Sequence, residues 1–250
     1  MTEALGHLEV DGARLAWRRN PGRGPTLLWL GGFRSEMAGT KAQALAGWAD
    51  DVGRDFLRFD YFGHGASDGA FEQGTITRWR RDALAVIDEL TQGPVILVGS
   101  SMGGWLACLA AMARADRVAG LLLVAPAADF TERLLKPELG REALAEITTR
   151  GVWRRPSEYD PAGYPITRNL LEDGARWSIL PGPIPIEAPV RLLQGGADPD
   201  VPWRHALDLA MALKSQDLVF SLVRDGDHRL SRPQDLTRLL ALAEELSGLA

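Results

Sequence analysis

The chain has 250 residues, which is enough for one large domain with a substantial core. Its 28 Lys and Arg residues against 33 Asp and Glu residues give a formal net charge of −5. Neither sign of charge forms a long run, so we do not expect a nucleic acid partner. The longest apolar stretches are strand-sized, well below the ~20 residues that a membrane-spanning helix needs, so we expect no membrane span.

The N-terminus and the cysteine content give an expectation about the compartment. Residues Met1 to His7 contain neither a basic segment followed by an apolar core nor an Arg-rich amphipathic leader. Cys108 is the only cysteine, so no intramolecular disulfide can form, in agreement with a reducing compartment. These features predict a cytoplasmic protein.

Along the chain, apolar runs bounded by Gly or Pro alternate with segments of helical period, a pattern typical of βαβ units on a mostly parallel sheet. The segment His7–Arg18 alternates around Asp11-Gly12, which predicts an antiparallel hairpin. The further strands are expected at Thr26–Leu30, Phe56–Phe59, Pro94–Gly99, Gly120–Val124, Val190–Leu193 and Leu218–Val223, and helices at Lys41–Asp50, Ile76–Leu90, Ser101–Arg114 and Pro233–Leu246. The sequence therefore predicts an α/β fold.

The regular alternation breaks between Phe130 and Pro189. A helical piece around Glu138–Arg150 is followed by a region rich in aromatic residues and proline. We interpret residues 130–188 as a cap inserted over the carboxyl edge of the sheet, and residues 1–250 as a single domain around it.

One pentapeptide at a strand-to-helix junction could carry a nucleophile. Residues Gly99-Ser-Ser101-Met-Gly103 match G-x-S-x-G and fall between a buried strand and a helix. A serine on so tight a turn has a strained backbone and needs small neighbours, which Gly99, Gly103 and Gly104 provide. The hydroxyl would then lie at the sheet edge, beside a helix N-terminus that favours developing negative charge.

An acid and a base follow in the chain order that this motif requires. Asp198 comes in the first loop after the strand Val190–Leu193, and His228 comes in the loop after Leu218–Val223. Serine is a weak nucleophile until a base removes its proton, so we predict His228 as general base and Asp198 as the carboxylate that orients it. Asp200 is the rival for the place of the acid.

We interpret the acidic neighbours of His228, and the other histidines of the chain, as residues without a direct part in the reaction. Asp225 and Asp227 face solvent or shape the turn before His228, and His7, His64 and His205 are structural or exposed. His64 in particular is explained by the turn that its two flanking glycines allow.

The tetrahedral intermediate of acyl transfer needs amide donors. The N–H groups of Met102, the residue after the nucleophile, and of Phe33, in the loop after the first buried strand, are the candidates. No Cys/His cluster, H-E-x-x-H sequence or Gly-rich phosphate motif is present, so neither a metal nor another cofactor is expected.

Several longer segments add a more specific resemblance. They are Gly31-Gly-Phe-Arg-Ser-Glu-Met-Ala-Gly-Thr-Lys41, Arg58-Phe-Asp-Tyr-Phe-Gly-His-Gly-Ala-Ser-Asp-Gly69, Val98-Gly-Ser-Ser-Met-Gly-Gly-Trp105, Gly151-Val-Trp-Arg-Arg-Pro-Ser157, Pro183-Ile-Pro-Ile-Glu-Ala-Pro-Val-Arg-Leu-Leu193, Asp198-Pro-Asp-Val-Pro-Trp203 and Gly226-Asp-His-Arg229. From about Thr26 to the last helix, the chain resembles the animal mitochondrial abhydrolase domain-containing protein ten family of α/β hydrolases. The resemblance implies an α/β-hydrolase fold, a triad at Ser101, Asp198 and His228, and hydrolysis of acylated proteins or acyl glucuronides. No mitochondrial leader is recognised here, so we interpret the chain as a prokaryotic relative.

We therefore predict a serine esterase or thioesterase whose substrate is a small acyl ester or thioester, or an acylated protein. Aromatic residues of the cap, Trp153, Tyr159, Tyr164 and Trp177, either line an apolar acyl pocket or pack the cap's own small core. A binding protein that kept the fold without the reaction is an alternative, as is a cofactor-free haloperoxidase or carbon–carbon hydrolase. The sequence leaves acyl length, leaving group and oligomeric state open.

Overall fold

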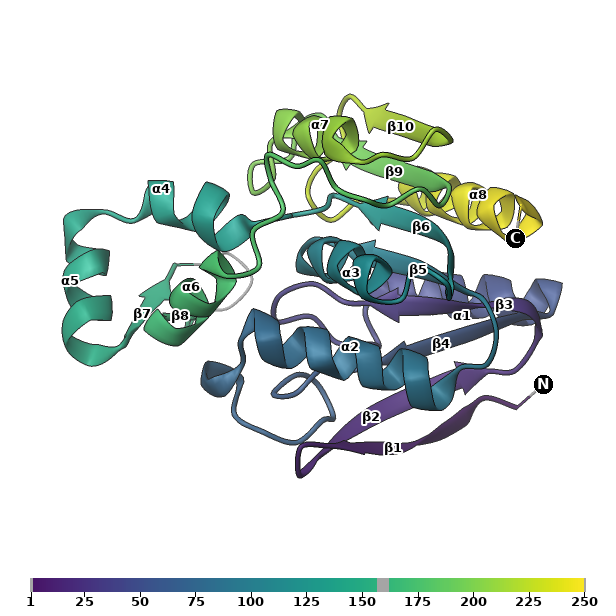
Figure 1. Ribbon diagram of the computed structural model, residues 1–250, viewed down its shortest axis with the longest axis horizontal. Helices are drawn as coiled ribbons and strands as arrows, with labels where there is room; N and C mark the ends of the chain where they lie inside the picture. Colours follow the sequence, from purple (N-terminus) through teal and green to yellow (C-terminus); the bar gives the residue numbers. More distant parts are fainter. Residues whose placement is uncertain (1, 157–161, 250) are drawn as a thin grey trace.

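The computed structural model describes residues 2–156 and 162–249 and confirms the predicted fold class. A central sheet has the strand order β1-β2-β4-β3-β5-β6-β9-β10 and carries helices on both faces (Figure 1). The strands are β1 (Ala4–Val10), β2 (Ala13–Asn20), β3 (Arg23–Leu30), β4 (Arg54–Phe59), β5 (Val95–Ser100), β6 (Val118–Val124), β9 (Val190–Gly195) and β10 (Leu218–Val223). The strands β1, β2 and β4 pair antiparallel in turn, and the pairs from β4 to β10 are parallel.

The N-terminal hairpin forms where the sequence predicts it. Asp11 and Gly12 have φ values of 50° and 74°, the left-handed pair that a tight hairpin turn requires. Val10 and Ala13 face each other across this turn, and the register continues to Ala4 and Arg19.

Two apolar layers lie on opposite faces of the sheet. In β3, Leu27 and Trp29 join one buried cluster while Leu28 and Leu30 join the other, because successive side chains of a strand point to opposite faces. The first layer packs against α1 (Thr40–Val52) and α8 (Pro233–Leu249). The second packs against α2 (Ile76–Leu90), α3 (Met102–Ala113) and α7 (Trp203–Ala212).

An insertion occupies the chain between β6 and β9. Its elements are a π-helical turn η2 (Thr131–Leu135), α4 (Lys136–Glu138), α5 (Arg141–Arg150), the antiparallel pair β7 (Val152–Arg155) and β8 (Tyr164–Thr167), and α6 (Arg168–Ala175). They gather at one end of the molecule, and both termini lie at the other end (Figure 1).

The prediction of one helical piece over Glu138–Arg150 is wrong in its first turn. The backbone leaves the helical region at Leu139, where ψ is 109°, and α5 begins only after Gly140. The reason is local, because glycine in a helix interior loses more chain entropy than other residues and is readily placed at a boundary.

Polar contacts tie the insertion to the sheet layers at its base. The buried Asp129 carboxylate accepts hydrogen bonds from the amides of Ile179 (2.9 Å) and Leu180 (2.8 Å). On the α2 side, Thr77 donates to Asp173 of α6 through its amide (2.7 Å) and its hydroxyl (2.6 Å). The chain that leaves β6 and the chain that returns toward β9 are thus joined at one carboxylate.

Within the described residues, none of the helices is both long and apolar enough to cross a membrane.

Candidate active site

Ser101 lies on the sharp turn between β5 and α3. Its φ and ψ values are 55° and −120°, a backbone region that a residue with a Cβ rarely adopts. The turn is held because the Ser101 amide donates to Val124 (2.9 Å) and the Ser101 carbonyl accepts from Gly104 (2.9 Å) and Ala127 (3.0 Å). Such strain persists only where the surrounding structure holds it in place, and here hydrogen bonds fix the peptide groups before and after the Ser101 Cα.

Two glycines make this turn sterically possible. A Cβ on Gly99 would lie 2.4 Å from the carbonyl oxygen of Gly103, and a Cβ on Gly103 would lie 1.9 Å from the carbonyl oxygen of Leu30. Both obstacles are backbone atoms that cannot turn aside. The small residues of the pentapeptide therefore allow α3 to approach β5 and the end of β3.

The structure brings the three predicted side chains together in one hydrogen-bonded chain. His228 Nε2 lies 3.1 Å from Ser101 Oγ, and His228 Nδ1 lies 2.8 Å from Asp198 Oδ2. The serine follows β5, the aspartate follows β9 and the histidine follows β10. They meet because the carboxyl ends of parallel strands share one edge of the sheet.

The Asp198 carboxylate is fully buried and held on every side. Its Oδ1 accepts from the amides of Asp200 (2.9 Å) and Val201 (2.8 Å), and its Oδ2 accepts from Gln194 Nε2 (3.2 Å) as well as from His228. Gln194, at the end of β9, is a positioning residue that the sequence reasoning missed. A polar residue directly after the apolar pair Leu192-Leu193 in a buried strand was its sequence signal.

The rival aspartate has a different neighbour. The Asp200 carboxylate lies 3.9 Å from Arg155 of β7, whereas the carboxylate that accepts from the His228 imidazole is that of Asp198. Among the described residues, Asp198, Asp200 and His228 place ligand atoms within 4.8 Å of one another, close enough to hold a metal ion. A cation there would compete with the hydrogen bond between Asp198 and His228. The geometry therefore favours the hydrogen-bonded relay of Asp198, His228 and Ser101.

The segment that carries His228 is shaped by two further side chains. Asp227 Oδ1 accepts from the Leu230 amide (2.9 Å), as expected for a residue that shapes the turn. Lys41, at the start of α1, donates from Nζ to the carbonyl of Arg229. Burial lowers the pKa of Lys41 to about 8, against an opposing attraction from Asp227.

The two candidate oxyanion donors belong to the residue after Ser101 and to a loop that approaches Ser101. Met102 is the first residue of α3 and directly follows the serine. Phe33 lies in the loop after β3, and this loop approaches closely, because a Cβ on Gly32 would be 3.3 Å from Ser101 Cβ. The arrangement can therefore present two amides to one carbonyl oxygen.

The four predicted pocket residues have different surroundings. The Tyr164 ring lies edge-on to Phe33, with centroids 6.2 Å apart, so it faces the loop beside Ser101. Trp153, on β7, is half-buried against the larger apolar cluster. Trp177 lies at the base of the insertion, where its Nε1 donates to Thr77 (2.7 Å) and Arg80 stacks on its ring. Tyr159 lies outside the described residues.

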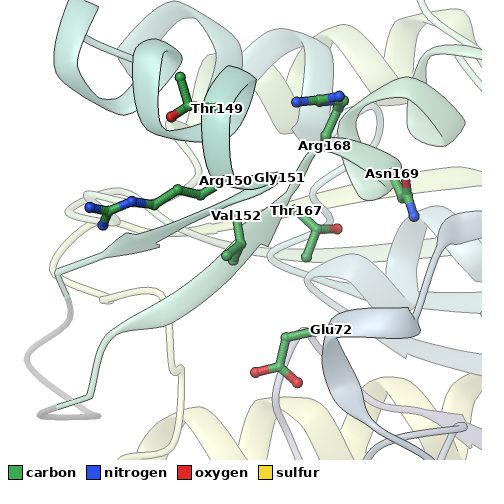
Figure 2. A pocket seen from close by; sticks show the side chains of 8 residues that line it. All are labelled: Glu72, Thr149, Arg150, Gly151, Val152, Thr167, Arg168 and Asn169. Carbon is green, nitrogen blue, oxygen red and sulfur yellow. The ribbon is translucent and has the colours of Figure 1, made fainter.

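A separate depression of about 480 Å³ lies between the insertion and Glu72, which precedes α2 (Figure 2). Its lining residues are Glu72, Thr149, Arg150, Gly151, Val152, Thr167, Arg168 and Asn169. The Arg168 guanidinium is committed to the carbonyls of Ile147 (3.0 Å) and Thr148. This hollow contains none of the predicted site residues.

The other histidines are built into the structure. His205 is buried, and its Nε2 donates to the carbonyl of Ala128 (2.8 Å). His64 is buried beside the loop after β3, and burial lowers its pKa to about 4. Both placements agree with the interpretation of these two histidines as structural.

Fold and site together define an α/β hydrolase of the serine-hydrolase type. The family model described as "Serine aminopeptidase, S33" matches residues 30–173. The chain is 39% identical to "Palmitoyl-protein thioesterase ABHD10, mitochondrial" of Bos taurus, over 94% of this chain and 77% of the relative. It therefore belongs to the ABHD10 family of α/β hydrolases, and we describe it as an enzyme of the esterase or thioesterase kind.

Two solved structures agree with this assignment. A putative hydrolase from Agrobacterium vitis S4 is 44% identical, with a TM-score of 0.94 over 98% of this chain and 99% of the other. The mouse α/β hydrolase domain-containing protein 10 is 36% identical, with a TM-score of 0.89 over 97% and 98% of the two chains. The similarity thus extends through the insertion as well as the sheet.

Proposed function

We propose that the chain cleaves carboxylic ester or thioester bonds through an acyl-Ser101 intermediate. The observation that carries the proposal is the hydrogen-bonded chain from Asp198 through His228 to Ser101, with distances of 2.8 Å and 3.1 Å. The position of this chain at the sheet edge, beside two amides that can face the same carbonyl oxygen, supports it further.

The first half of the reaction uses the relay as it stands. Ser101 Oγ attacks the substrate carbonyl carbon while His228 Nε2 takes the hydroxyl proton, and the carbonyl π electrons move to the oxygen. The amides of Phe33 and Met102 donate to that oxyanion. Asp198 stabilises the imidazolium that forms and holds its Nδ1–H in place.

Collapse of the intermediate breaks the bond to the leaving group. His228 gives its proton to the departing alcohol or thiol, and the acyl group remains on Ser101. A water oxygen then attacks the acyl carbon while His228 removes the water proton. The bond from the acyl carbon to Ser101 Oγ breaks, Ser101 takes the proton back from His228, and the carboxylic acid is released.

The names of the relatives and the aromatic residues near Ser101 suggest the substrate class. The Bos taurus relative is named as a palmitoyl-protein thioesterase, so we propose long-chain acyl thioesters, including acylated proteins, as substrates. Tyr164 beside Phe33 gives the acyl chain an apolar surface next to Ser101. Trp153 of the same insertion is half-buried against the larger apolar cluster. Acyl glucuronides, which the sequence resemblance implies, are the second class to compare.

We propose residues 1–250 as a single domain, with residues 130–188 as a cap that covers the carboxyl edge of the sheet. A cytoplasmic location stays a prediction, since the relatives carry the word mitochondrial in their names.

The nucleophile is tested with a fluorophosphonate probe and p-nitrophenyl esters. Wild type is expected to be labelled at Ser101 and to release nitrophenol, and Ser101→Ala is expected to do neither. Ser100→Ala, one residue earlier in β5, is the matched control and is expected to keep both the labelling by the probe and the release of nitrophenol. Undiminished turnover by Ser101→Ala would refute the assignment.

The same assays separate the alternatives. A binding protein without activity would release no nitrophenol at any chain length. A haloperoxidase or carbon–carbon hydrolase would show its main rate on other substrates. Matched oxygen esters and thioesters with short and long acyl chains then measure preference, and Tyr164→Ala is expected to raise KM for the long chains more than for the short ones.

A further inference from the structure

His64 lies outside the relay but contacts the loop that passes Ser101. Its Nδ1 lies 3.1 Å from the carbonyl oxygen of Phe62, and its Nε2 lies 3.3 Å from the amide nitrogen of Arg34. A carbonyl only accepts and an amide N–H only donates. The imidazole is therefore neutral, with its hydrogen on Nδ1 and its Nε2 lone pair facing the Arg34 N–H.

The hydrogen bond from Arg34 falls on a strained position of a tight turn. The Ser35 amide donates to the Gly32 carbonyl (3.1 Å), which closes a four-residue turn with Arg34 in third place. Arg34 has a φ of 59°, the left-handed conformation that the third residue of a type II turn needs and that glycine usually supplies. In a type I turn the third residue has a negative φ, and the peptide between the second and third residues is rotated by about half a turn.

The direction of the Arg34 N–H is thus what distinguishes the two turns. With His64 Nε2 as its acceptor, this N–H is satisfied only in the left-handed form. Without the acceptor, a residue with a side chain favours the other form, since its Cβ makes the left-handed region unfavourable.

The imidazole can act as a fixed point because it is itself held. His64 is 3% exposed. The rings of Tyr61, Phe71 and Trp79 surround it edge-on, with centroid distances of 5.6, 5.0 and 5.3 Å. The Phe33 ring packs on Phe71 (4.9 Å) and Trp79 (5.9 Å), so the turn and the histidine share one aromatic cluster.

We propose that His64 is a positioning residue for the oxyanion hole: by accepting the Arg34 N–H it anchors the turn that begins at Gly32 beside Ser101, and so fixes where the Phe33 amide lies relative to the reacting carbonyl. This inference rests on the proposed function, because the Phe33 donor is part of that proposal. It gives the histidine of Gly63-His-Gly65 a role in the reaction without contact with the substrate.

Two substitutions separate the two nitrogen atoms of the ring. His64→Asn places an amide near the Nδ1 position, where it can still donate to Phe62, and leaves no acceptor for Arg34. His64→Gln reaches the Nε2 position, where its carbonyl oxygen can accept from Arg34. Thermal unfolding of both variants reports whether the aromatic cluster remains folded.

The expected result is a fall in kcat with little change in KM for His64→Asn, and recovery of most of that fall in His64→Gln. Complete loss of an oxyanion donor costs about 10²–10³ in kcat, so we expect a fall of about 10- to 100-fold for a donor that is misaligned. The affinity for a trifluoromethyl ketone, which forms an oxyanion on Ser101, is expected to fall by a similar factor.

A second measurement keeps the test valid if His64→Asn is poorly folded. Glycine adopts a positive φ without help, so Arg34→Gly is expected to restore kcat when combined with His64→Asn. Arg34→Gly alone supplies the reference rate for this double-mutant cycle. A structural role of His64 would give additive losses instead.

The outcomes distinguish this inference from the proposed function. If wild type does not hydrolyse esters or thioesters, or if Ser101→Ala remains active, the proposed function fails. If wild type is active and Ser101→Ala is inactive, but His64→Asn and His64→Gln have equal kcat and equal ketone affinity, His64 does not position the donor and the inference is overturned.

Discussion

Replacement of Asp198 by asparagine tests the relay most directly, because the surrounding donors decide how the new side-chain amide must lie. Oδ1 of Asp198 accepts two backbone amides, those of Asp200 (2.9 Å) and Val201 (2.8 Å). In Asp198→Asn the side-chain oxygen is therefore kept at this position, and the NH₂ group is directed at His228 Nδ1. An NH₂ group can only donate, so the imidazole must accept at Nδ1 and carry its hydrogen on Nε2.

That tautomer cannot act as the base. With hydrogen on Nε2, the ring faces Ser101 Oγ with a donor and has no lone pair for the serine proton. The corresponding change in a serine protease lowers kcat by about 10⁴. We expect a fall of about 10³–10⁴ here, which is about 4–6 kcal/mol of transition-state stabilisation at ~1.4 kcal/mol for each factor of ten.

The assay is kcat on a p-nitrophenyl ester, normalised to the fraction of folded enzyme by thermal unfolding. Asp200→Asn is the matched control, since its side chain faces Arg155 and its amide is unchanged. It is expected to stay within about threefold of wild type. If Asp198→Asn retained more than a tenth of the activity while Asp200→Asn lost a thousandfold, the assignment of the acid would be reversed.

Three further predictions concern stability. Gly103→Ala is expected to prevent folding, because its Cβ would lie 1.9 Å from the Leu30 carbonyl oxygen. Gly47→Ala, at an exposed helix site with open space around it, is expected to raise the free energy of unfolding by about 0.5–1 kcal/mol. Soluble yield and urea unfolding measure both effects, and a well-folded Gly103→Ala protein would contradict the geometry. Asp129→Ala leaves two buried amides without their acceptor and is expected to cost about 3 kcal/mol in urea unfolding; a loss below ~1 kcal/mol would mean that water replaces the carboxylate. Lys41 has a folded-state pKa of about 8 and an ordinary value of 10.5, so between these pH values the unfolded chain holds the proton that the folded chain has released. The free energy of unfolding of wild type should therefore rise with pH over this window relative to Lys41→Met, and a constant difference between the two proteins would show that the lysine titrates normally.

The parts of the fold that the sequence predicts are those with strong local periodicity. The α2 limits, Ile76–Leu90, agree with the prediction, because one face of that helix is regularly apolar. The helix α7 was missed, although a parallel pair such as β9 and β10 requires a crossover between its strands. Its sequence follows Pro202 closely and reads as the end of a loop, so topology rather than periodicity was the available signal.

The insertion shows why some contacts resist sequence reasoning. The strands β7 and β8 are four residues each, too short for alternation to be distinguished from loop composition. In the site, Ser101, Asp198 and His228 could be named because each falls at a strand end, where topology dictates convergence. The contacts of Gln194 could not be predicted, since they depend on how the chain after β9 folds back on the strand end. The contact of His64 with Arg34 depends on the angle at which two loops approach, and spacing along the chain does not encode that angle.

The carboxylate of Asp129 has a consequence for how this enzyme could be re-engineered. The chain that leaves β6 and the chain that returns toward β9 are joined at this carboxylate, so the segment between them can change in length at little entropic cost, since doubling a loop adds only ~0.6 kcal/mol to its closure. A foreign segment spliced between residues 130 and 178 would leave the serine, the acid and the imidazole on their own strands. Ile147, Ile166 and Leu170 of the present segment share one apolar cluster with α2 and α3, and Asp173 accepts from Thr77. A replacement would therefore fold only if it also supplied an apolar face of matching shape and an acceptor for Thr77.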